Sequence, residues 1–355
     1  MATRRARSPL PPPSFARALA ALGLLAACGG DAASTPADPP SNDEDVLDDM
    51  RDAGATGRLD AGATGTRRDA GATARDGGAS ASPSLDAAAR DDAPATPGNP
   101  PTGAAPTEAS ASARGPYEVK TYTSGYPDAP GYADSTIHYP ADGEPPYAAV
   151  AIVPGFVSPQ DSIKAWGPFL ASHGIVAMTL GTNMPTDQPP ARETALWEAI
   201  GTLKGENTRM GSPLNGKVAT GRLGTMGWSM GGGGTLLVAQ NHPELKATIA
   251  LCPWNPGYSY AKVKVPALLL ATQADILAGG QSQGFYASIA NDVPKLLWER
   301  AGADHWANND PAQEKGAVGR YGLAWLKVFL DGDERYRPFL RAMPPNASDY
   351  ESNVK

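Results

Sequence analysis

The sequence predicts an α/β fold in which helices cover both faces of a mostly parallel central sheet. Three observations predict it. From Gly115 onward, short β-like runs alternate with helical patterns. Several of these runs are apolar throughout, as strands covered on both faces are. By contrast, residues 29–114 contain no Phe, Trp or Tyr, so the folded domain is expected only in the later part of the chain.

Residues 1–28 have the composition of an export signal. Four arginines precede the apolar run 18–27, which is too short to span a bilayer as a helix, and Cys28 follows at once. Small residues directly before a cysteine are typical of a bacterial lipoprotein signal. We therefore expect a lipid anchor on Cys28, membrane association and a cell-envelope location. The alternative is an ordinary secretory signal with an incidental cysteine, which predicts a secreted protein.

Residues 29–114 are predicted to form a disordered tether. They are rich in Ala, Gly, Asp, Pro, Ser and Thr, and an Asp-Ala-Gly-Ala-Thr unit begins at residues 52, 60 and 69. The spacing is irregular and each unit lacks an apolar face, which excludes a stacked solenoid. The segment has 15 acidic and 7 basic residues, so its net charge of −8 accounts for the acidity of the whole chain.

Residues 115–345 are predicted to be the catalytic domain, followed by a C-terminal tail at 346–355. From Gly115 onward the chain has 22 acidic and 19 basic residues without a basic stripe, so nucleic acid is not expected as a partner. If Cys28 is lipidated, Cys252 is the remaining cysteine and no intramolecular disulfide can form. Cys252 ends an apolar run, which predicts a small buried side chain rather than a catalytic thiol. We expect a monomer.

The expected elements of the domain alternate along the chain. Strands are expected at 118–122, 135–138, 148–153, 175–180, 247–251, 267–271 and 295–299, and a further strand ends at 223–226. Helices are expected at 161–172 and 191–203, and a third continues through 235–239. In such a sheet, ligands bind beyond the carboxyl ends of the parallel strands.

The most informative motif is Gly227-Trp228-Ser229-Met230-Gly231, followed by three more glycines. A G-x-S-x-G sequence between a buried strand and a helix predicts a nucleophile elbow, in which a sharp turn exposes the serine hydroxyl at a helix N-terminus. In a chain with 40 Gly the pattern could also arise by chance in a loop. The apolar residues before and after it favour the elbow, with Ser229 as the nucleophile.

A serine nucleophile needs a base, and two histidines follow Ser229 in the chain. His242 is expected at the end of the helix that starts after Ser229, about 20 Å away at 1.5 Å per residue, so it cannot serve. His305 follows a predicted strand and lies in an expected loop, where catalytic residues concentrate. We therefore predict that His305 is the base.

The base needs a carboxylate that orients its ring and stabilises its protonated form. Asp275 follows the predicted strand 267–271 and is the preferred candidate. Asp304 is the alternative, but neighbours in sequence seldom orient each other well, and Asp292 is expected at a helix end. The oxyanion hole should use the main-chain N–H of Met230 and an N–H from the loop after strand 148–153, for which Phe156 is the natural donor.

Several blocks together resemble the bacterial cutinase and poly(ethylene terephthalate) hydrolase family, and the resemblance covers nearly the whole domain. The blocks are Pro154-Gly155-Phe156, Trp166 to Gly174, Asp187-Gln188-Pro189, Gly227 to Gly234, Pro253-Trp254, Asp275, His305 and Gly322 to Lys327. The resemblance implies an α/β-hydrolase fold. It also implies a Ser229, Asp275 and His305 triad and an oxyanion hole at Phe156 and Met230.

The resemblance further implies substrate contacts by tryptophans. Trp254 matches the aromatic residue that clamps a substrate ring, Trp228 stands beside the nucleophile, and Trp306 extends the cleft wall. The alternative for any tryptophan is core packing, which we expect for Trp166 and Trp325 on helical patterns. Family members usually tie the C-terminal region with a disulfide, which this chain lacks.

Three functions are consistent with these observations. The first is a serine ester hydrolase that cleaves polymeric esters, cutin-like or aromatic polyesters, through an acyl-enzyme. The second is an esterase or lipase for small or acylglycerol esters. The third is a surface-anchored binding module whose triad is idle, against which the complete set of Ser, Asp and His argues. No cofactor and no metal are predicted for the reaction.

Overall fold

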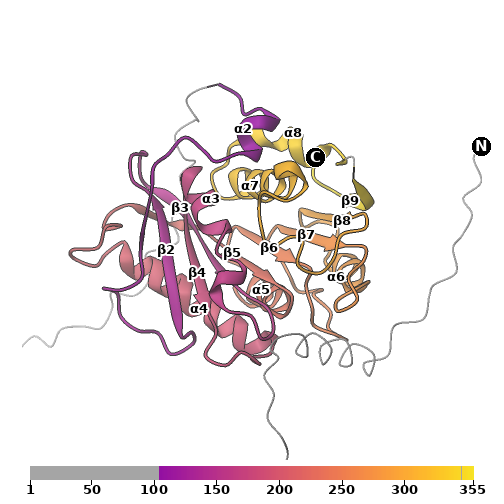
Figure 1. Ribbon diagram of the computed structural model, residues 1–355, viewed down its shortest axis with the longest axis horizontal. Helices are drawn as coiled ribbons and strands as arrows, with labels where there is room; N and C mark the ends of the chain where they lie inside the picture. Colours follow the sequence, from indigo (N-terminus) through magenta and orange to yellow (C-terminus); the bar gives the residue numbers. More distant parts are fainter. Residues whose placement is uncertain (1–103, 345) are drawn as a thin grey trace, which may run out of the picture. The chain divides into compact units, whose positions relative to one another are not determined.

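A computed structural model describes residues 104–344 and 346–355 (Figure 1). The predicted signal at 1–28, Cys28 and the tether up to residue 103 lie outside the described residues. The strands are β1 (Val119–Tyr122), β2 (Asp134–Pro140), β3 (Tyr147–Val153), β4 (Ile175–Gly181), β5 (Val218–Trp228), β6 (Ala247–Leu251), β7 (Ala267–Thr272), β8 (Lys295–Arg300) and β9 (Ala347–Ser352).

The α-helices are α2 (Glu108–Ser112), α3 (Trp166–Ser172), α4 (Pro189–Glu206), α5 (Met230–Asn241), α6 (Gln281–Ser288), α7 (Ala317–Phe329) and α8 (Arg337–Arg341). Short 3-10 helices are η1 (Gln160–Ser162), η2 (Glu314–Gly316) and η3 (Glu334–Tyr336). No helix in the described part of the chain combines the length and the hydrophobicity that a membrane crossing requires.

All nine strands form one sheet in the order β1-β2-β4-β3-β5-β6-β7-β8-β9. The strands from β4 to β8 in this order are parallel, whereas β1, β2 and β9 pair antiparallel at the two edges. Residues of β3, β4, β6 and β7 are buried throughout, which agrees with their unbroken apolar sequences. The predicted mostly parallel sheet is confirmed.

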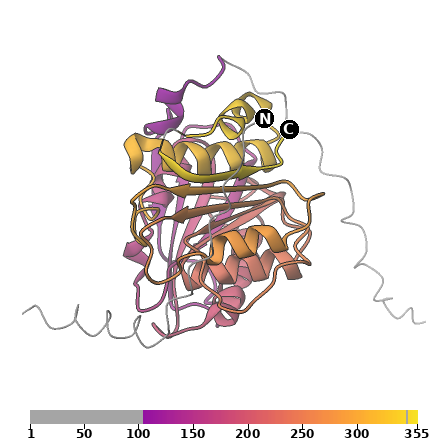
Figure 2. The same cartoon turned by 90° about the vertical axis from the view of Figure 1, so that its right-hand side faces the viewer.

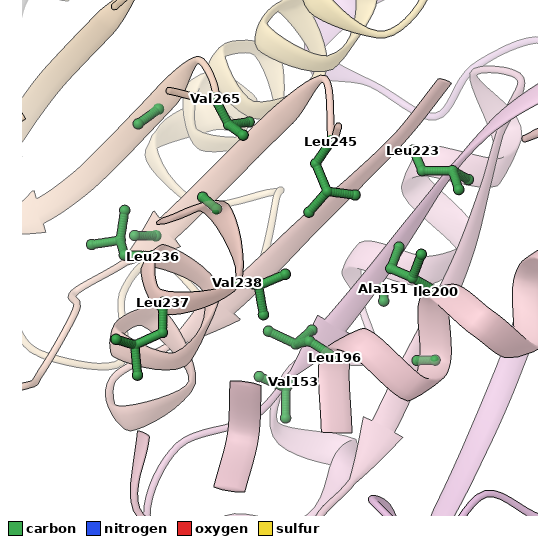
Figure 3. Packing of buried hydrophobic residues seen from close by; sticks show 14 of the residues in the cluster. Ala151, Val153, Leu196, Ile200, Leu223, Leu236, Leu237, Val238, Leu245 and Val265 are labelled. Carbon is green, nitrogen blue, oxygen red and sulfur yellow. The ribbon is translucent and has the colours of Figure 1, made fainter. Parts of the chain in front are cut away.

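Helices cover both faces of the sheet. Figure 2 shows α7 in yellow along one face and the orange and pink helices on the other. On one face, the core joins residues of α4, α5 and α6 to the sheet, and on the other it joins those of α3 and α7. In Figure 3, Leu196 and Ile200 of α4 and Leu236 to Val238 of α5 project among the side chains of the first core.

The helix expected at 161–172 begins later, at Trp166. Pro168 accounts for the difference, because proline lacks an N–H group and is tolerated only in the first turn of a helix. Upstream of Trp166 the chain instead forms η1.

The structure corrects both boundaries of the predicted domain. Residues 347–352, expected in a tail, form β9, which pairs with Leu296 to Arg300 of β8. At the other end, α2 lies before Gly115, and Ala111 of this helix is completely buried against the domain. Polar sequence hid both segments, since an edge strand and a short helix do not need an apolar run.

Candidate active site

Ser229 lies between β5 and α5, in the strand, turn and helix arrangement that the motif predicts. Its backbone angles are φ 56° and ψ −118°, a conformation that is costly for a residue with a Cβ atom. Two glycines make this turn possible. A Cβ on Gly227 would collide with the carbonyl of Gly231, and one on Gly231 would lie 2.5 Å from the carbonyl oxygen of Pro154.

Main-chain hydrogen bonds hold the strained turn. The Ser229 N–H donates to the Leu251 carbonyl at 2.9 Å, and the Ser229 carbonyl accepts from Gly233 and from Trp254 at 3.0 and 2.8 Å. The loop after β3 also lies against the serine, since a Cβ on Gly155 would be 2.8 Å from that of Ser229. The predicted oxyanion loop and the predicted nucleophile are therefore neighbours.

The structure joins the predicted base to the preferred acid. The Nδ1 atom of His305 lies 2.7 Å from Oδ2 of Asp275, and both side chains are buried. Oδ1 of Asp275 accepts the N–H groups of Leu277 and Ala278, each at 2.8 Å. Asp304, the alternative acid, instead accepts from the N–H of Trp306 in its own loop. Of these two carboxylates, Asp275 is the one that contacts the His305 ring.

The loop that carries His305 is held by polar contacts that the sequence did not reveal. The indole N–H of Trp228 donates to the His305 carbonyl at 2.9 Å. Asn308 is completely buried and donates to the Leu270 carbonyl at 2.9 Å. Arg300 donates to the carbonyl of Ala307 and to Oδ1 of Asn308 at 2.7 and 3.0 Å. These contacts tie the loop to β5, β7 and β8.

Residues 95–355 match a protein family that is described as PETase, PET hydrolase-like. A bis(hydroxyethyl) terephthalate hydrolase of Streptomyces coelicolor is 38% identical over 248 residues, 68% of this chain and 77% of that enzyme. Cutinase cut1 of Thermobifida fusca is 38% identical over 252 residues, 70% of this chain and 77% of the cutinase. The chain belongs to the PET hydrolase-like family.

A third relative of this PET hydrolase-like protein supports the same assignment. Cutinase 2 of Thermobifida cellulosilytica is 38% identical over 238 residues, 66% of this chain and 88% of the cutinase. The predicted family is thereby confirmed, and with it the α/β-hydrolase fold and the class of carboxylic ester hydrolases.

The tryptophans of this PET hydrolase-like protein divide into core and surface residues. Trp166 and Trp325 are completely buried, as predicted. Trp254 is half-buried in the loop after β6, and Trp306 is 48% exposed beside His305. Trp228 is 3% exposed and lies in the core on the α3 and α7 side of the sheet. Its indole N–H donates to the His305 carbonyl, so it links β5 to the His305 loop, and its predicted contact with substrate stays a prediction.

Cys252 lies close to the predicted acid and base. Among the described residues, Cys252, Asp275 and His305 form the one group whose potential metal ligands lie within 4.8 Å of each other. The donor set fits a metal poorly. Burial raises the pKa of the Cys252 thiol to about 12, which keeps it protonated, and Nδ1 of His305 is already bonded to Asp275. Cys252 is a buried packing residue, as predicted.

Proposed function

We propose that this protein is a serine ester hydrolase that cleaves polyesters, cutin-like or aromatic ones such as poly(ethylene terephthalate), through an acyl-enzyme. The observations that carry the proposal are the buried Asp275 and His305 pair and the strained turn at Ser229, whose neighbour Trp228 has its ring centroid 5.2 Å from that of His305. The relatives named cutinase and bis(hydroxyethyl) terephthalate hydrolase support ester chemistry of this kind.

In the proposed mechanism, His305 removes the proton of Ser229 as Oγ attacks the ester carbonyl. Because Nδ1 of His305 is hydrogen-bonded to Asp275, Nε2 is the nitrogen that takes this proton. The carbonyl oxygen becomes an oxyanion, which the main-chain N–H groups of Phe156 and Met230 stabilise. The N–H of Met230 is the first of α5, where helix geometry supplies no acceptor within the helix.

The tetrahedral intermediate then collapses. The bond between the carbonyl carbon and the alkoxy oxygen breaks, and His305 gives its proton to the leaving alcohol. Water attacks the acyl carbon while His305 takes its proton, the bond between that carbon and Oγ of Ser229 breaks, and His305 returns the proton to Oγ as the carboxylic acid leaves. Bond making and proton transfer balance without any cofactor.

Exposed apolar side chains favour an extended apolar substrate over a small ester. Val157, Ile276 and Trp306 follow β3, β7 and β8, at the carboxyl ends of parallel strands near Ser229, and are 56%, 63% and 48% exposed. Apolar groups on a polymer chain could cover these side chains and gain the free energy of burial. A binding module without catalysis would have no use for the strained serine, which argues against an idle triad.

We also propose that the lipid anchor on Cys28 and the segment 29–103 hold this domain at the cell envelope. The sequence of the signal and its terminal cysteine supports this, together with the absence of aromatic residues between Cys28 and the domain. Replacing Cys28 with Ser should release the protein from the membrane fraction. A Cys28→Ser protein that stays with the membrane would contradict the anchor.

The experiment that tests the activity compares the wild-type protein with Ser229→Ala on p-nitrophenyl butyrate, tributyrin and an amorphous poly(ethylene terephthalate) film. Ser162→Ala is the matched control, because its hydroxyl donates to the Pro159 carbonyl at the surface. We expect hydrolysis by the wild type and the control, including soluble products from the film, and near-complete loss in Ser229→Ala. Hydrolysis of soluble esters without any attack on the film would point to a small-ester esterase.

A further inference from the structure

Arg192 is a completely buried cation on the first turn of α4. Its guanidinium donates three hydrogen bonds to main-chain carbonyls. Nη1 donates to Pro154 at 2.8 Å, Nε to Asp187 at 2.9 Å, and Nη2 to Pro185 at 3.3 Å. Burying a charge is costly unless it is well bonded, so this arrangement needs a physical reason.

The three carbonyls belong to the loops after β3 and β4. Pro154 directly follows β3 and precedes Gly155 and Phe156, while Pro185 and Asp187 lie between β4 and α4. The N–H of Val157 also donates to the Pro185 carbonyl, at 2.7 Å. Arg192 is therefore bonded directly to Pro154, at the start of the turn that contains Phe156. It is linked indirectly to Val157, at the end of that turn, because both donate to the Pro185 carbonyl.

The turn between these two points would not hold its shape unaided. Val157 has a φ of 50°, which costs free energy for a β-branched residue and persists only where surrounding contacts enforce it. The N–H of Phe156 lies between the two anchored points. A shift of either one would rotate that N–H away from the carbonyl oxygen that it is proposed to bind.

Arg192 also contacts the helix that begins beside Ser229. A Cβ on Gly234 of α5 would lie 2.9 Å from that of Arg192. The same Pro154 carbonyl lies against Gly231, in the first turn of α5. Arg192 thus contacts both α5, which begins next to Ser229, and the turn that contains Phe156.

We propose that Arg192 is a positioning residue that sets the Phe156 N–H of the oxyanion hole relative to Ser229. The inference rests on the proposed function, since it assigns Arg192 a part in that reaction. It also gives a role to the block Asp187-Gln188-Pro189, whose first carbonyl is an Arg192 acceptor. Burial lowers the pKa of Arg192 to about 10, so the side chain stays charged at neutral pH.

The test compares Arg192→Gln with Ile200→Ala as a matched control for stability. Ile200 lies two turns further along α4 and is buried among apolar side chains (Figure 3). The Ile200→Ala substitution should lower the melting temperature and leave the conformation of the Phe156 turn unchanged. The readouts are kcat and KM on p-nitrophenyl butyrate well below both melting temperatures, and the inhibition constant of butylboronic acid. The tetrahedral boronate places an oxygen in the oxyanion hole.

We expect kcat to fall about 10- to 100-fold in Arg192→Gln with KM changed less than about threefold, because oxyanion contacts act in the transition state. The inhibition constant should rise by a similar factor. Ile200→Ala should keep both values. If Arg192→Gln does not fold, Arg192→Lys decides on the same criteria, because lysine keeps the charge but cannot bond three carbonyls.

A folded Arg192 variant with kcat and inhibition constant within about twofold of wild type would overturn the positioning role. Ser229→Ala is assayed alongside to separate this result from failure of the proposed function. Activity that survives in Ser229→Ala would overturn the proposed function and the role of Arg192 with it. Activity that depends on Ser229 but not on Arg192 would overturn the positioning role alone.

Discussion

The Nδ1 atom of His305 lies 2.7 Å from Oδ2 of Asp275, although 30 residues separate them in the chain. Oδ1 of Asp275 accepts two N–H groups of its own loop, which fix the position of the carboxylate independently of His305. This contact fixes the orientation of the imidazole and favours the tautomer with its hydrogen on Nδ1. This arrangement suits a general base better than a mere structural ion pair.

Asp275→Asn should lower kcat on p-nitrophenyl butyrate by roughly 10⁴, because an amide cannot hold the imidazole in the productive tautomer. Asp304→Asn is the matched control, since its side chain bonds the N–H of Trp306 and not the ring. It should keep kcat within about threefold of wild type. Steady-state kinetics at pH 7.5 measure both. A larger loss in Asp304→Asn would show that the acid is misassigned.

Trp254→Ala and Trp306→Ala should mainly affect long or polymeric substrates. Trp254 is half-buried and bonded to the Ser229 carbonyl, and Trp306 is exposed beside the His305 ring. An aromatic side chain in such a place can stack on a ring or cover an alkyl chain, a gain of about 0.5–1.5 kcal/mol beyond burial. Product release from a polyester film should therefore fall several-fold, while turnover of p-nitrophenyl acetate changes little. Equal losses on both substrates, or loss of folding, would assign these side chains to the core.

A chain that begins at Ala104 should be more stable than one that begins at Gly115. The shorter chain loses α2, whose Ser112 accepts a hydrogen bond from Arg320 at 3.0 Å, and the bond of the Ala113 carbonyl with His173. We expect a loss on the order of 1–3 kcal/mol in the free energy of unfolding, measured with urea, and little change in kcat. Identical urea midpoints would show that α2 contributes nothing to the fold.

Stability should decrease as the pH falls below about 6.5, partly because of His138 in β2. Burial lowers the pKa of His138 to about 4 from 6.5, and Lys164 adds to the effect. The unfolded chain therefore binds the proton more tightly, and unfolding is favoured progressively between pH 6.5 and pH 4. The contribution is on the order of 3 kcal/mol at the acid end of this window.

His138→Leu tests this contribution directly. Neither ring nitrogen of His138 has a hydrogen-bond partner among the described residues, so an apolar side chain of similar size should not lose a polar contact. Urea unfolding between pH 7.5 and pH 4.5 should show a shallower loss of stability in the variant. Parallel curves for the two proteins would contradict the assignment to His138.

The strands around the site were predictable because burial on both faces leaves unbroken apolar runs. β6 has the predicted bounds, and β3 and β7 differ from theirs by one residue. The Ser229 turn was predictable because all of its requirements are local, with glycines two residues on either side. Asp275 could be preferred to Asp304 from its place after a strand.

Other features depend on contacts between distant segments, which sequence patterns do not show. The bond from Trp228 to the His305 carbonyl spans 77 residues, and that from Arg192 to the Pro154 carbonyl spans 38. From sequence alone, an arginine in the first turn of a helix, such as Arg192, is expected at the surface, but its side chain is completely buried. Likewise, the sequence does not show that Trp228 bonds to the His305 loop. β9 is polar and pairs on one side only, so its sequence resembles a tail.

The assignment of Ser229 as the nucleophile is tested most directly by mass spectrometry after reaction with a p-nitrophenyl alkylphosphonate, which phosphonylates an activated serine irreversibly. We expect one adduct per protein on the peptide that contains Ser229, at a rate that matches the loss of ester hydrolysis. We expect no adduct in His305→Ala over the same time. Inactivation with the adduct on another residue, or full hydrolytic activity with Ser229 modified, would contradict the assignment of Ser229 as the nucleophile.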